Sequence, residues 1–335
     1  MKNGMVVAQF EREFSAYVNA RWAVAMTNGT VTLQAALVAL GAETRNRVAV
    51  PPLTMSATTI AVLQCGATPV FRDVDPRTWL LKASKADARW LMPVSLYGLH
   101  APSYDAAFTV DDAAQTLRKH GDAAFTSYSL QSSKIVSTGE GGVLVTNDEN
   151  LATRVREYTS LGYRMKADEP RISSDILKSP SFKRHHSLGI NGRMNDVTAE
   201  EGLKQLGEAD RLLGQRRQAA AIYRDAIGGC DWITPQYVPN GWQHDYWCYS
   251  VALEHEHLWH PFVDAIEANG GERPYAAWRI TYFEPAFKHL AKAGTCPIAE
   301  DLQPRLLQLQ TNKLDSAERN AAAIRLAIKE IGGSI

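Results

Sequence analysis

The sequence predicts an α/β protein with a mainly parallel sheet and a smaller second α/β domain. Short apolar segments alternate with stretches of helical periodicity along the first half of the chain, which is typical of a parallel sheet covered by helices. The chain has 335 residues and is 45% hydrophobic, so its length favours two domains and its composition allows a large core. We expect a large domain over residues 1–215 and a small C-terminal domain over residues 216–335.

Apolar segments followed by polar turns predict the strands of the large domain. They lie at residues 23–26, 47–51, 68–71, 90–96, 108–111, 125–130 and 142–146. Helices are expected where apolar residues recur at spacings of three and four, at residues 8–20, 33–40, 54–63, 149–158 and 195–227. In the small domain, a strand at residues 247–253 alternates with helices at residues 259–268 and 314–331. The polar, basic residues 166–186 predict a long loop.

The composition argues against several classes of function. Basic and acidic residues number 36 each, and this balance disfavours a nucleic-acid-binding surface. The four cysteines are scattered without CxxC spacing, which favours reduced thiols over disulfides or a zinc site. The chain has no signal-peptide core and no apolar run of the ~18 residues that a membrane span needs. We therefore expect a cytoplasmic protein without a membrane or nucleic-acid partner.

Two polar motifs lie beside expected strands of the large domain. The sequence TNGT, residues 27–30, stands between a strand and a helix, where free backbone N–H groups and the helix dipole suit a phosphate. The sequence DDAAQ, residues 111–115, follows another strand, at the edge where parallel sheets bind ligands. Taken alone, each motif is at least as well explained as a helix cap, and TNGT is better explained so.

Two further motifs follow in the second half of the large domain. Lys134 lies between the strand end SYS, residues 127–129, and the glycine cluster GEGG, residues 139–142. A lysine buried beside a cationic ring has a lowered pKa and can act as nucleophile and proton carrier. The sequence GINGRMN, residues 189–195, precedes a helix. Locally, an exposed loop lysine and a simple turn remain the alternatives.

The order of these motifs resembles that of a known enzyme family. The elements are NGT, P-x2-T-x3-T at residues 51–58, DDAAQ, S-x4-K-x4-GEGG and GINGRM. They resemble the DegT/DnrJ/EryC1/StrS aminotransferases, strongly over residues 10–206 and weakly beyond. The resemblance implies a fold type I enzyme dependent on pyridoxal 5′-phosphate, active as a homodimer with shared sites. It implies transfer of an amino group from glutamate or glutamine to a keto-sugar, with a nucleotide-linked sugar as the leading candidate.

The resemblance also implies roles for individual residues. Lys134 is expected to form the Schiff base and move the proton, and Asp112 to pair with the pyridine nitrogen as the second catalytic residue. Gln115 is expected near the ring hydroxyl. The other expected cofactor contacts are Gly29, Thr30 and Ser129 at the phosphate, Met55 at the ring, Asn191 from the neighbouring subunit, and Thr54 and Thr58 at the cofactor edge.

The sequence departs from the family in two places. Met55 stands where family members often have an aromatic residue, although a thioether can still pack against a ring face. The region between residues 75 and 127 is shorter than usual, so peripheral helices there should be absent or reduced to turns. These departures leave two alternatives open: a cyclitol (inosose) aminotransferase, and a protein that binds the cofactor but has lost transamination. Lys134 itself favours transamination, because relatives with histidine at this position are dehydratases.

Three features outside the motifs have more than one interpretation. The basic residues 183–186 could bind an anionic nucleotide or form a charged loop. Arg273 could bind a carboxylate or form a structural ion pair. The histidines at positions 255, 257 and 260 do not share one face of a helix or strand, so we expect no metal site.

Overall fold

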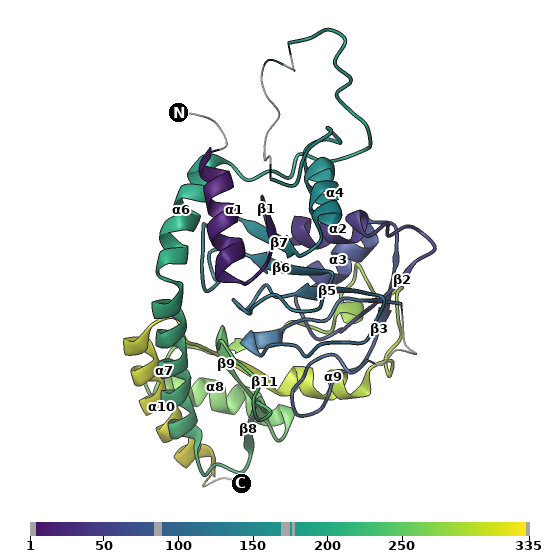
Figure 1. The fold of residues 1–335 in the computed structure, drawn as a ribbon. Coiled ribbons are helices and arrows are strands. Elements are labelled where there is room, and N and C mark those ends of the chain that lie inside the picture. Colours follow the sequence, from purple (N-terminus) through teal and green to yellow (C-terminus); the bar gives the residue numbers. More distant parts are fainter. Residues whose placement is uncertain (1–4, 84–88, 169–174, 176–177, 333–335) are drawn as a thin grey trace.

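The structure, a computed structural model, describes residues 5–83, 89–168, 175 and 178–332. A seven-stranded sheet in the order β1-β7-β6-β5-β4-β2-β3 forms the centre of its large part (Figure 1). The strands from β6 to β3 pair in parallel, and β7 is antiparallel to both of its neighbours. The strand bounds are β1 Trp22–Met26, β2 Arg47–Val50, β3 Thr68–Phe71, β4 Trp90–Leu91, β5 Phe108–Asp112, β6 Phe125–Ser129 and β7 Gly142–Thr146. The prediction of a mainly parallel sheet is confirmed.

Helices cover both faces of this sheet. One face carries α2, α3 and α4, and the other carries α1 and α6 (Figure 1). Alternate residues of β1 belong to the two hydrophobic clusters: Val24 packs toward α2, and Ala25 packs toward α1. The helix bounds are α1 Met5–Tyr17, α2 Gly29–Ala39, α3 Ala57–Gln64, α4 Glu149–Thr159 and α6 Asp196–Gly207.

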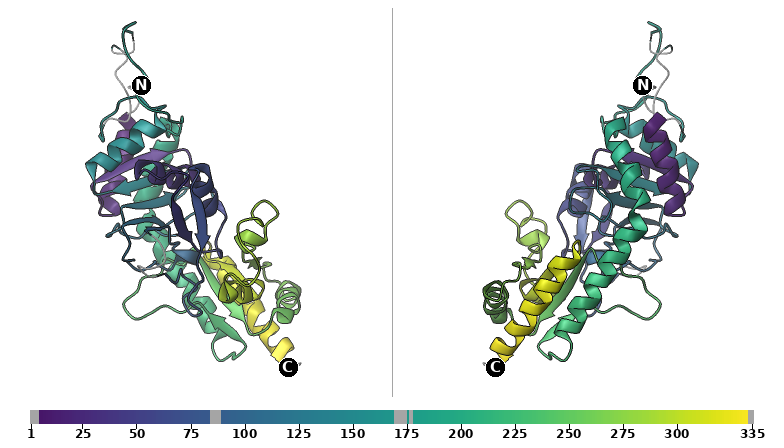
Figure 2. Two further views of the ribbon diagram at one scale, coloured as in Figure 1. Left: turned by 90° about the vertical axis from the view of Figure 1, so that its right-hand side faces the viewer. Right: turned by 90° about the vertical axis from the view of Figure 1, so that its left-hand side faces the viewer.

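The C-terminal part is built on a four-stranded antiparallel sheet in the order β10-β11-β9-β8. Its helices α7 and α10 lie side by side, as both views in Figure 2 show. The bounds are α7 Ala209–Ile227, β8 Ile233–Pro235, β9 Cys248–Leu253, α8 Trp259–Ala268, β10 Tyr275–Ala276, α9 Pro297–Leu302, β11 Leu306–Gln310 and α10 Leu314–Gly332. Short 3-10 helices lie at Leu96–Gly98, Glu256–Leu258, Thr281–Phe283 and Gln303–Arg305.

Helix α7 connects the two parts of the molecule. Near its start, Leu213 packs into the cluster that holds α1 and α6 against the large sheet. From Ala219 onward, its apolar residues belong to the cluster between α8, α10 and the second sheet. The expected division between residues 215 and 216 falls inside this helix and stays a prediction.

Two expected elements differ clearly from those observed. The strand expected at residues 90–96 pairs regularly only at Trp90–Leu91, because Pro93 lacks a backbone N–H to continue the ladder. The single helix expected at residues 195–227 is two helices, which meet at Glu208. Residues 113–124 contain no helix, as the shortened region predicted. The expected loop at residues 166–186 lies partly outside the described residues.

Candidate active site

A cavity of about 590 Å³ opens at the carboxyl-terminal edge of the large sheet. Loops that follow β1, β2, β5 and β6 converge there, because the carboxyl ends of parallel strands share one edge. The lining comprises Asn28, Gly29, Thr30, Val31, Leu33, Gln34, Thr54, Met55, Ala57, Gln64, Val94, Asp112, Ala114, Gln115, Ser129, Gln131, Ser133, Lys134, Glu140, Trp247 and Trp278.

The N-terminus of α2 forms one wall of the cavity. Asn28 caps the helix, and its side-chain oxygen accepts a hydrogen bond from the Val31 N–H at 2.9 Å. A Cβ atom at Gly29 would lie 2.9 Å from the Cβ of Ser129, so only glycine lets the helix start this close to the end of β6. The helix dipole and free N–H groups at this end favour an anionic ligand.

A hydroxyl pair fixes this helix against the sheet. The Thr32 hydroxyl donates to the carbonyl oxygen of Gly29 at 2.6 Å, so its oxygen accepts the hydrogen of the Ser127 hydroxyl, also at 2.6 Å. Both side chains are buried. The first turn of α2 is therefore held directly beside the strand that leads to Lys134.

Asp112 is a buried carboxylate at the end of β5. Its Oδ2 accepts a hydrogen bond from the Thr58 hydroxyl at 2.8 Å, and its Oδ1 accepts one from the Ala114 N–H at 3.2 Å. Burial raises the pKa of Asp112, while these two hydrogen bonds and the nearby Lys134 cation oppose the rise. A cation in the cavity would further stabilise the ionised carboxylate.

Lys134 lies in the loop between β6 and β7. Its Nζ lies 4.9 Å from the ring centroid of Trp247, and the Trp247 indole N–H donates to the Ser133 carbonyl at 2.8 Å. Burial lowers the pKa of Lys134, and the negative charge of Asp112 opposes that change. The structure thus places a partly desolvated amine and a buried carboxylate around one cavity.

Eight of the ten predicted cofactor contacts line this cavity. They are Gly29, Thr30, Thr54, Met55, Asp112, Gln115, Ser129 and Lys134. Thr58 reaches it through Asp112. Asn191 does not: it is exposed and forms an antiparallel bridge with Ser160.

The family assignment follows from comparison with known sequences and structures. The sequence matches the profile of the DegT/DnrJ/EryC1/StrS aminotransferase family over residues 1–322. The chain belongs to this family. A GDP-perosamine synthase of Caulobacter vibrioides is 32% identical over 273 residues, covering 75% of this chain and 70% of that protein. A GDP-perosamine synthase of Escherichia coli O157:H7 is 29% identical over 332 residues, covering 91% and 85%.

Solved structures agree with the family assignment. S. venezuelae DesV, solved in complex with a ketimine intermediate, is 26% identical. It superposes with a TM-score of 0.84 over 97% of this chain and 90% of its own. The expected fold type I architecture, the enzyme class and the cofactor are confirmed: the chain is a pyridoxal-phosphate-dependent aminotransferase.

The cavity of this aminotransferase fits pyridoxal phosphate. A helix N-terminus suits the phosphate, a buried carboxylate suits a protonated ring nitrogen, and a partly desolvated lysine suits the aldehyde carbon. Gln115 is oriented from the backbone, since its side-chain carbonyl accepts the Tyr97 N–H. Met55 lines the cavity while 47% exposed, so the position where relatives often have an aromatic ring remains open to solvent.

Two tryptophans of the lining were not predicted from the sequence. Trp247 was expected inside a core strand, but β9 begins at Cys248 and Trp247 turns toward Lys134. A Cβ atom at Gly98 would lie 2.6 Å from the backbone nitrogen of Trp247, so the two segments can cross this closely only because residue 98 is glycine. Trp278 stacks on Trp247, with ring centroids 5.8 Å apart. No local pattern marks either residue, because distant chain segments bring them to the cavity.

The remaining features of the sequence lie elsewhere. Arg273 forms ion pairs with Asp264 at 3.1 Å and with Glu267. Of the two interpretations of Arg273, the structure therefore favours the structural ion pair over the binding of a ligand carboxylate. The basic residues 183–186 are exposed and do not contribute to the described lining. Within the described ranges, no three His, Cys, Asp or Glu side chains are grouped as metal ligands.

Proposed function

We propose that this aminotransferase moves an amino group from glutamate or glutamine to a keto-sugar, with Lys134 as the lysine that binds the cofactor. One observation carries the proposal. The Lys134 amine, the Asp112 carboxylate and the N-terminus of α2 surround a single cavity, and they come from the motifs that characterise the family in their usual order. The other residues of the lining support the same assignment of roles.

The lining is also consistent with a sugar as the amino acceptor. Trp247 and Trp278 offer flat apolar faces, and the amides Gln34, Gln64 and Gln131 offer hydrogen bonds to hydroxyl groups. Two relatives are named GDP-perosamine synthases, and this name denotes a nucleotide-linked amino sugar. A nucleotide-linked keto-sugar is therefore the acceptor that we favour over a cyclitol.

The residues of this site have separate tasks in the proposed reaction. Pyridoxal phosphate, when bound, supplies an electron sink for the charge that develops at the substrate carbon. The Lys134 amine, with its pKa lowered by burial, is available to take up and return a proton at Nζ. Asp112, held by Thr58 and Ala114, is placed to keep the ring nitrogen protonated. Trp247 covers the lysine and limits its contact with water.

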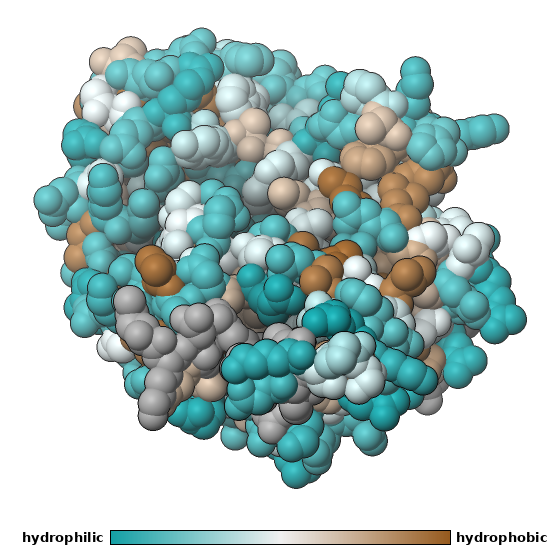
Figure 3. Space-filling model, turned by 90° about the horizontal axis from the view of Figure 1, so that it is seen from above, coloured by the Kyte–Doolittle hydropathy of each residue, from teal (hydrophilic) through white to brown (hydrophobic). Residues whose placement is uncertain are grey.

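We further propose a cytoplasmic homodimer in which Asn191 reaches the partner's cavity. Asn191 is exposed and does not line the cavity of its own chain, and Leu188, three residues earlier, is 95% exposed. On the face seen in Figure 3, hydrophobic residues are scattered among hydrophilic ones. No helix in the described residues is long and apolar enough to cross a membrane. Mixing Lys134→Ala and Asn191→Ala protomers should restore activity if each site needs both residues from different chains.

Spectroscopy of the half-reaction tests the proposed function. We expect the purified holoenzyme to show the visible absorbance of lysine-bound cofactor and to lose it when glutamate or glutamine converts the cofactor to its amino form. Lys134→Ala should lack both the band and the conversion, whereas Lys204→Ala, which changes an exposed lysine of α6, should retain them.

The outcomes separate the alternatives. A band that persists in Lys134→Ala would contradict the role of Lys134. If the wild-type enzyme binds the cofactor but neither glutamate nor glutamine converts it, the protein has lost transamination. The converted enzyme is then offered keto-sugar nucleotides and inososes, and recovery of the visible band identifies the acceptor class.

A further inference from the structure

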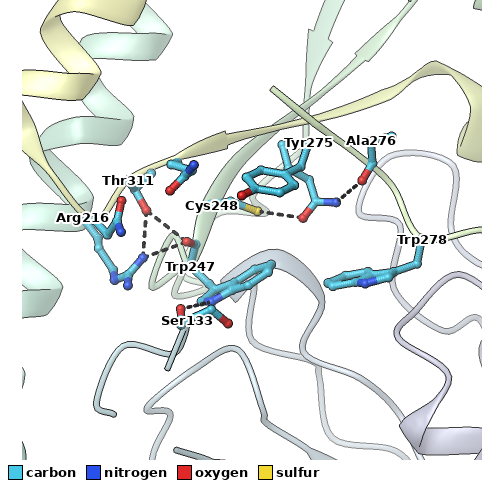
Figure 4. Close-up of a pocket in the computed structure, with 11 residues that line it drawn as sticks. Ser133, Arg216, Trp247, Cys248, Tyr275, Ala276, Trp278 and Thr311 are labelled. Atoms are coloured by element: carbon cyan, nitrogen blue, oxygen red, sulfur yellow. Dashed lines mark hydrogen bonds between the residues drawn. The ribbon is translucent and has the colours of Figure 1, made fainter. Parts of the chain in front are cut away.

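A second cavity adjoins the candidate active site on the side of the small sheet. It has a volume of about 320 Å³ and shares Ser133, Trp247 and Trp278 with the first cavity. Figure 4 shows the two tryptophans side by side, with residues of the C-terminal part above them. The two cavities are therefore neighbouring compartments with a common aromatic wall.

Arg216 of helix α7 lines this second cavity. Only 6% of the residue is exposed, and its Nη1 donates to the Trp247 carbonyl at 2.8 Å and to the Thr311 hydroxyl at 3.1 Å. Within the described residues, no carboxylate lies within ion-pair distance of this guanidinium, and Asp245, whose charge acts on it from farther away, is paired with His100 and Arg217. Burial lowers the pKa of Arg216 to about 10, and the charges of Cys248 and Asp245 oppose that change. A buried cation without a directly paired carboxylate is costly, so the site favours an anionic ligand.

The other residues of the cavity indicate the size of that anion's charge. The described lining holds Gln308, Gln310 and Asn312 but no acidic residue and no second cation. The Gln308 amide is fixed by a hydrogen bond to the Ala276 carbonyl at 2.7 Å. One guanidinium among neutral amides matches a single carboxylate better than a pyrophosphate, which needs more positive charge.

Cys248 and the aromatic wall connect this cation to Lys134. Burial raises the pKa of the Cys248 thiol to about 12, and the Arg216 and Lys134 cations both oppose that rise, so both lie near the thiol. Tyr97 stacks on Trp278 with ring centroids 6.1 Å apart. Its buried hydroxyl has no hydrogen-bond partner among the described residues. Tyr97 lines neither cavity, so this unpaired polar atom lies behind the aromatic wall.

We propose that the second cavity is the subsite for a carboxylate group of the amino-acid donor, bound by Arg216. This inference rests on the proposed aminotransferase function and names the residue that recognises its donor. When the amino group of the donor lies at Lys134, one carboxylate of the donor can extend into the second cavity. There the Arg216 guanidinium supplies the counter-charge. The phosphate of the cofactor stays at the opposite side, at the N-terminus of α2.

Binding of glutarate, an unreactive dicarboxylate, tests this subsite in the holoenzyme. Calorimetric titration should show that Arg216→Gln weakens glutarate binding by about 10-fold or more, since a buried charge-assisted hydrogen bond is lost. Arg216→Lys should lose less. The matched control Arg211→Gln changes an exposed arginine of the same helix, paired with Glu208, and should bind glutarate as the wild type does. The visible absorbance of each variant verifies that it holds the cofactor.

A crystal of the wild-type holoenzyme soaked with glutarate provides the second measurement, independent of whether Arg216→Gln folds. A carboxylate against Arg216 supports the inference, and a carboxylate bound elsewhere, or equal affinity of a folded Arg216→Gln, overturns it. Failure of the proposed function has a different signature. In that case no amino donor converts the cofactor of the wild type to its amino form, whatever the result with glutarate.

Discussion

Thr58 is the residue that orients the Asp112 carboxylate. Its hydroxyl can donate one hydrogen, and the 2.8 Å distance to Asp112 Oδ2 is much shorter than the 3.5 Å to the Met55 carbonyl. The side chain is fully buried, so no water replaces this hydrogen bond. Thr58 therefore acts on the cofactor through Asp112, as a positioning residue.

Replacing Thr58 by valine should weaken cofactor binding. Thr58→Val keeps the shape but removes the hydroxyl, so the pKa of Asp112 rises further and the ionised form is less available to pair with the ring nitrogen. We expect the Kd for pyridoxal phosphate to rise on the order of 10-fold, measured by titration of the visible band. Thr58→Ser should restore most of the affinity. Equal affinity of Thr58→Val and the wild type would contradict this role.

At this scale, much of the site was predictable because its motifs are contiguous in the sequence. Gly29, Asp112 and Lys134 each lie next to a strand end, and the sheet brings such ends together. Arg216 and Trp247 were not predicted as site residues. Their placement depends on how α7 and the segment before β9 pack against residues distant in the sequence, which no short motif encodes.

Among the elements, α1, β1 and α4 are joined by a buried ion pair. Glu11 of α1 accepts hydrogen bonds from Arg156 of α4 at 3.1 and 2.9 Å. The same carboxylate accepts the backbone N–H of Ala25 in β1 at 2.8 Å. Arg156 also donates to the carbonyl of Ala167. Because both charged side chains are buried, each depends on the other for its counter-charge.

Removing one partner of this pair should destabilise the fold. Glu11→Gln leaves Arg156 buried without a counterion, so we expect the free energy of unfolding to fall by about 3 kcal/mol in urea denaturation. Glu13→Gln, on the same helix but exposed, serves as the control. The double variant Glu11→Gln/Arg156→Gln should lose less than the sum of the single losses. Strict additivity would show that the pair is not coupled.

The sequence predicted most elements of the large sheet but not all of their bounds. Strands β3 and β7 have the expected limits, since Gly66 and Gly139, both with positive φ, lie in the turns before them. Strand β4 is shorter because the apolar pattern continues through Pro93, which cannot donate to the ladder. The periodicity across residues 195–227 did not reveal the break at Glu208, because both helices keep an apolar face toward the core.

The molecule as a whole contains two buried histidines that are neutral in the folded state. Burial lowers the pKa of His120 to about 4 and that of His244 to about 3. His244 Nδ1 accepts the Tyr246 N–H at 2.9 Å, a hydrogen bond that a protonated ring cannot accept. His120 Nδ1 lies 2.8 Å from the Thr126 hydroxyl. In the unfolded chain both rings protonate near pH 6.5.

These two histidines should therefore lower the stability of the fold as the pH drops below about 6.5, while the raised pKa values of Asp111 and Asp112 act in the opposite direction. Between that pH and the lowered pKa values the unfolded state binds more protons, at a cost of about 1.4 kcal/mol per pH unit for each histidine. Urea denaturation from pH 7 to pH 5 measures this slope. His120→Gln should have a shallower slope than the wild type, whereas His289→Gln, a variant of a histidine outside the buried set, should not. An unchanged slope in His120→Gln would contradict the assignment.

At the scale of the whole molecule, Lys134 should hold the cofactor in a cavity lined by residues from both parts of the chain. Reduction of the holoenzyme with sodium borohydride fixes the cofactor on the lysine that binds it, and peptide mass mapping then locates that lysine. We predict that the modification lies on the peptide containing Lys134 and is absent from the other lysine peptides. Modification of a different lysine, or of none in a protein that shows the visible band, would contradict the account.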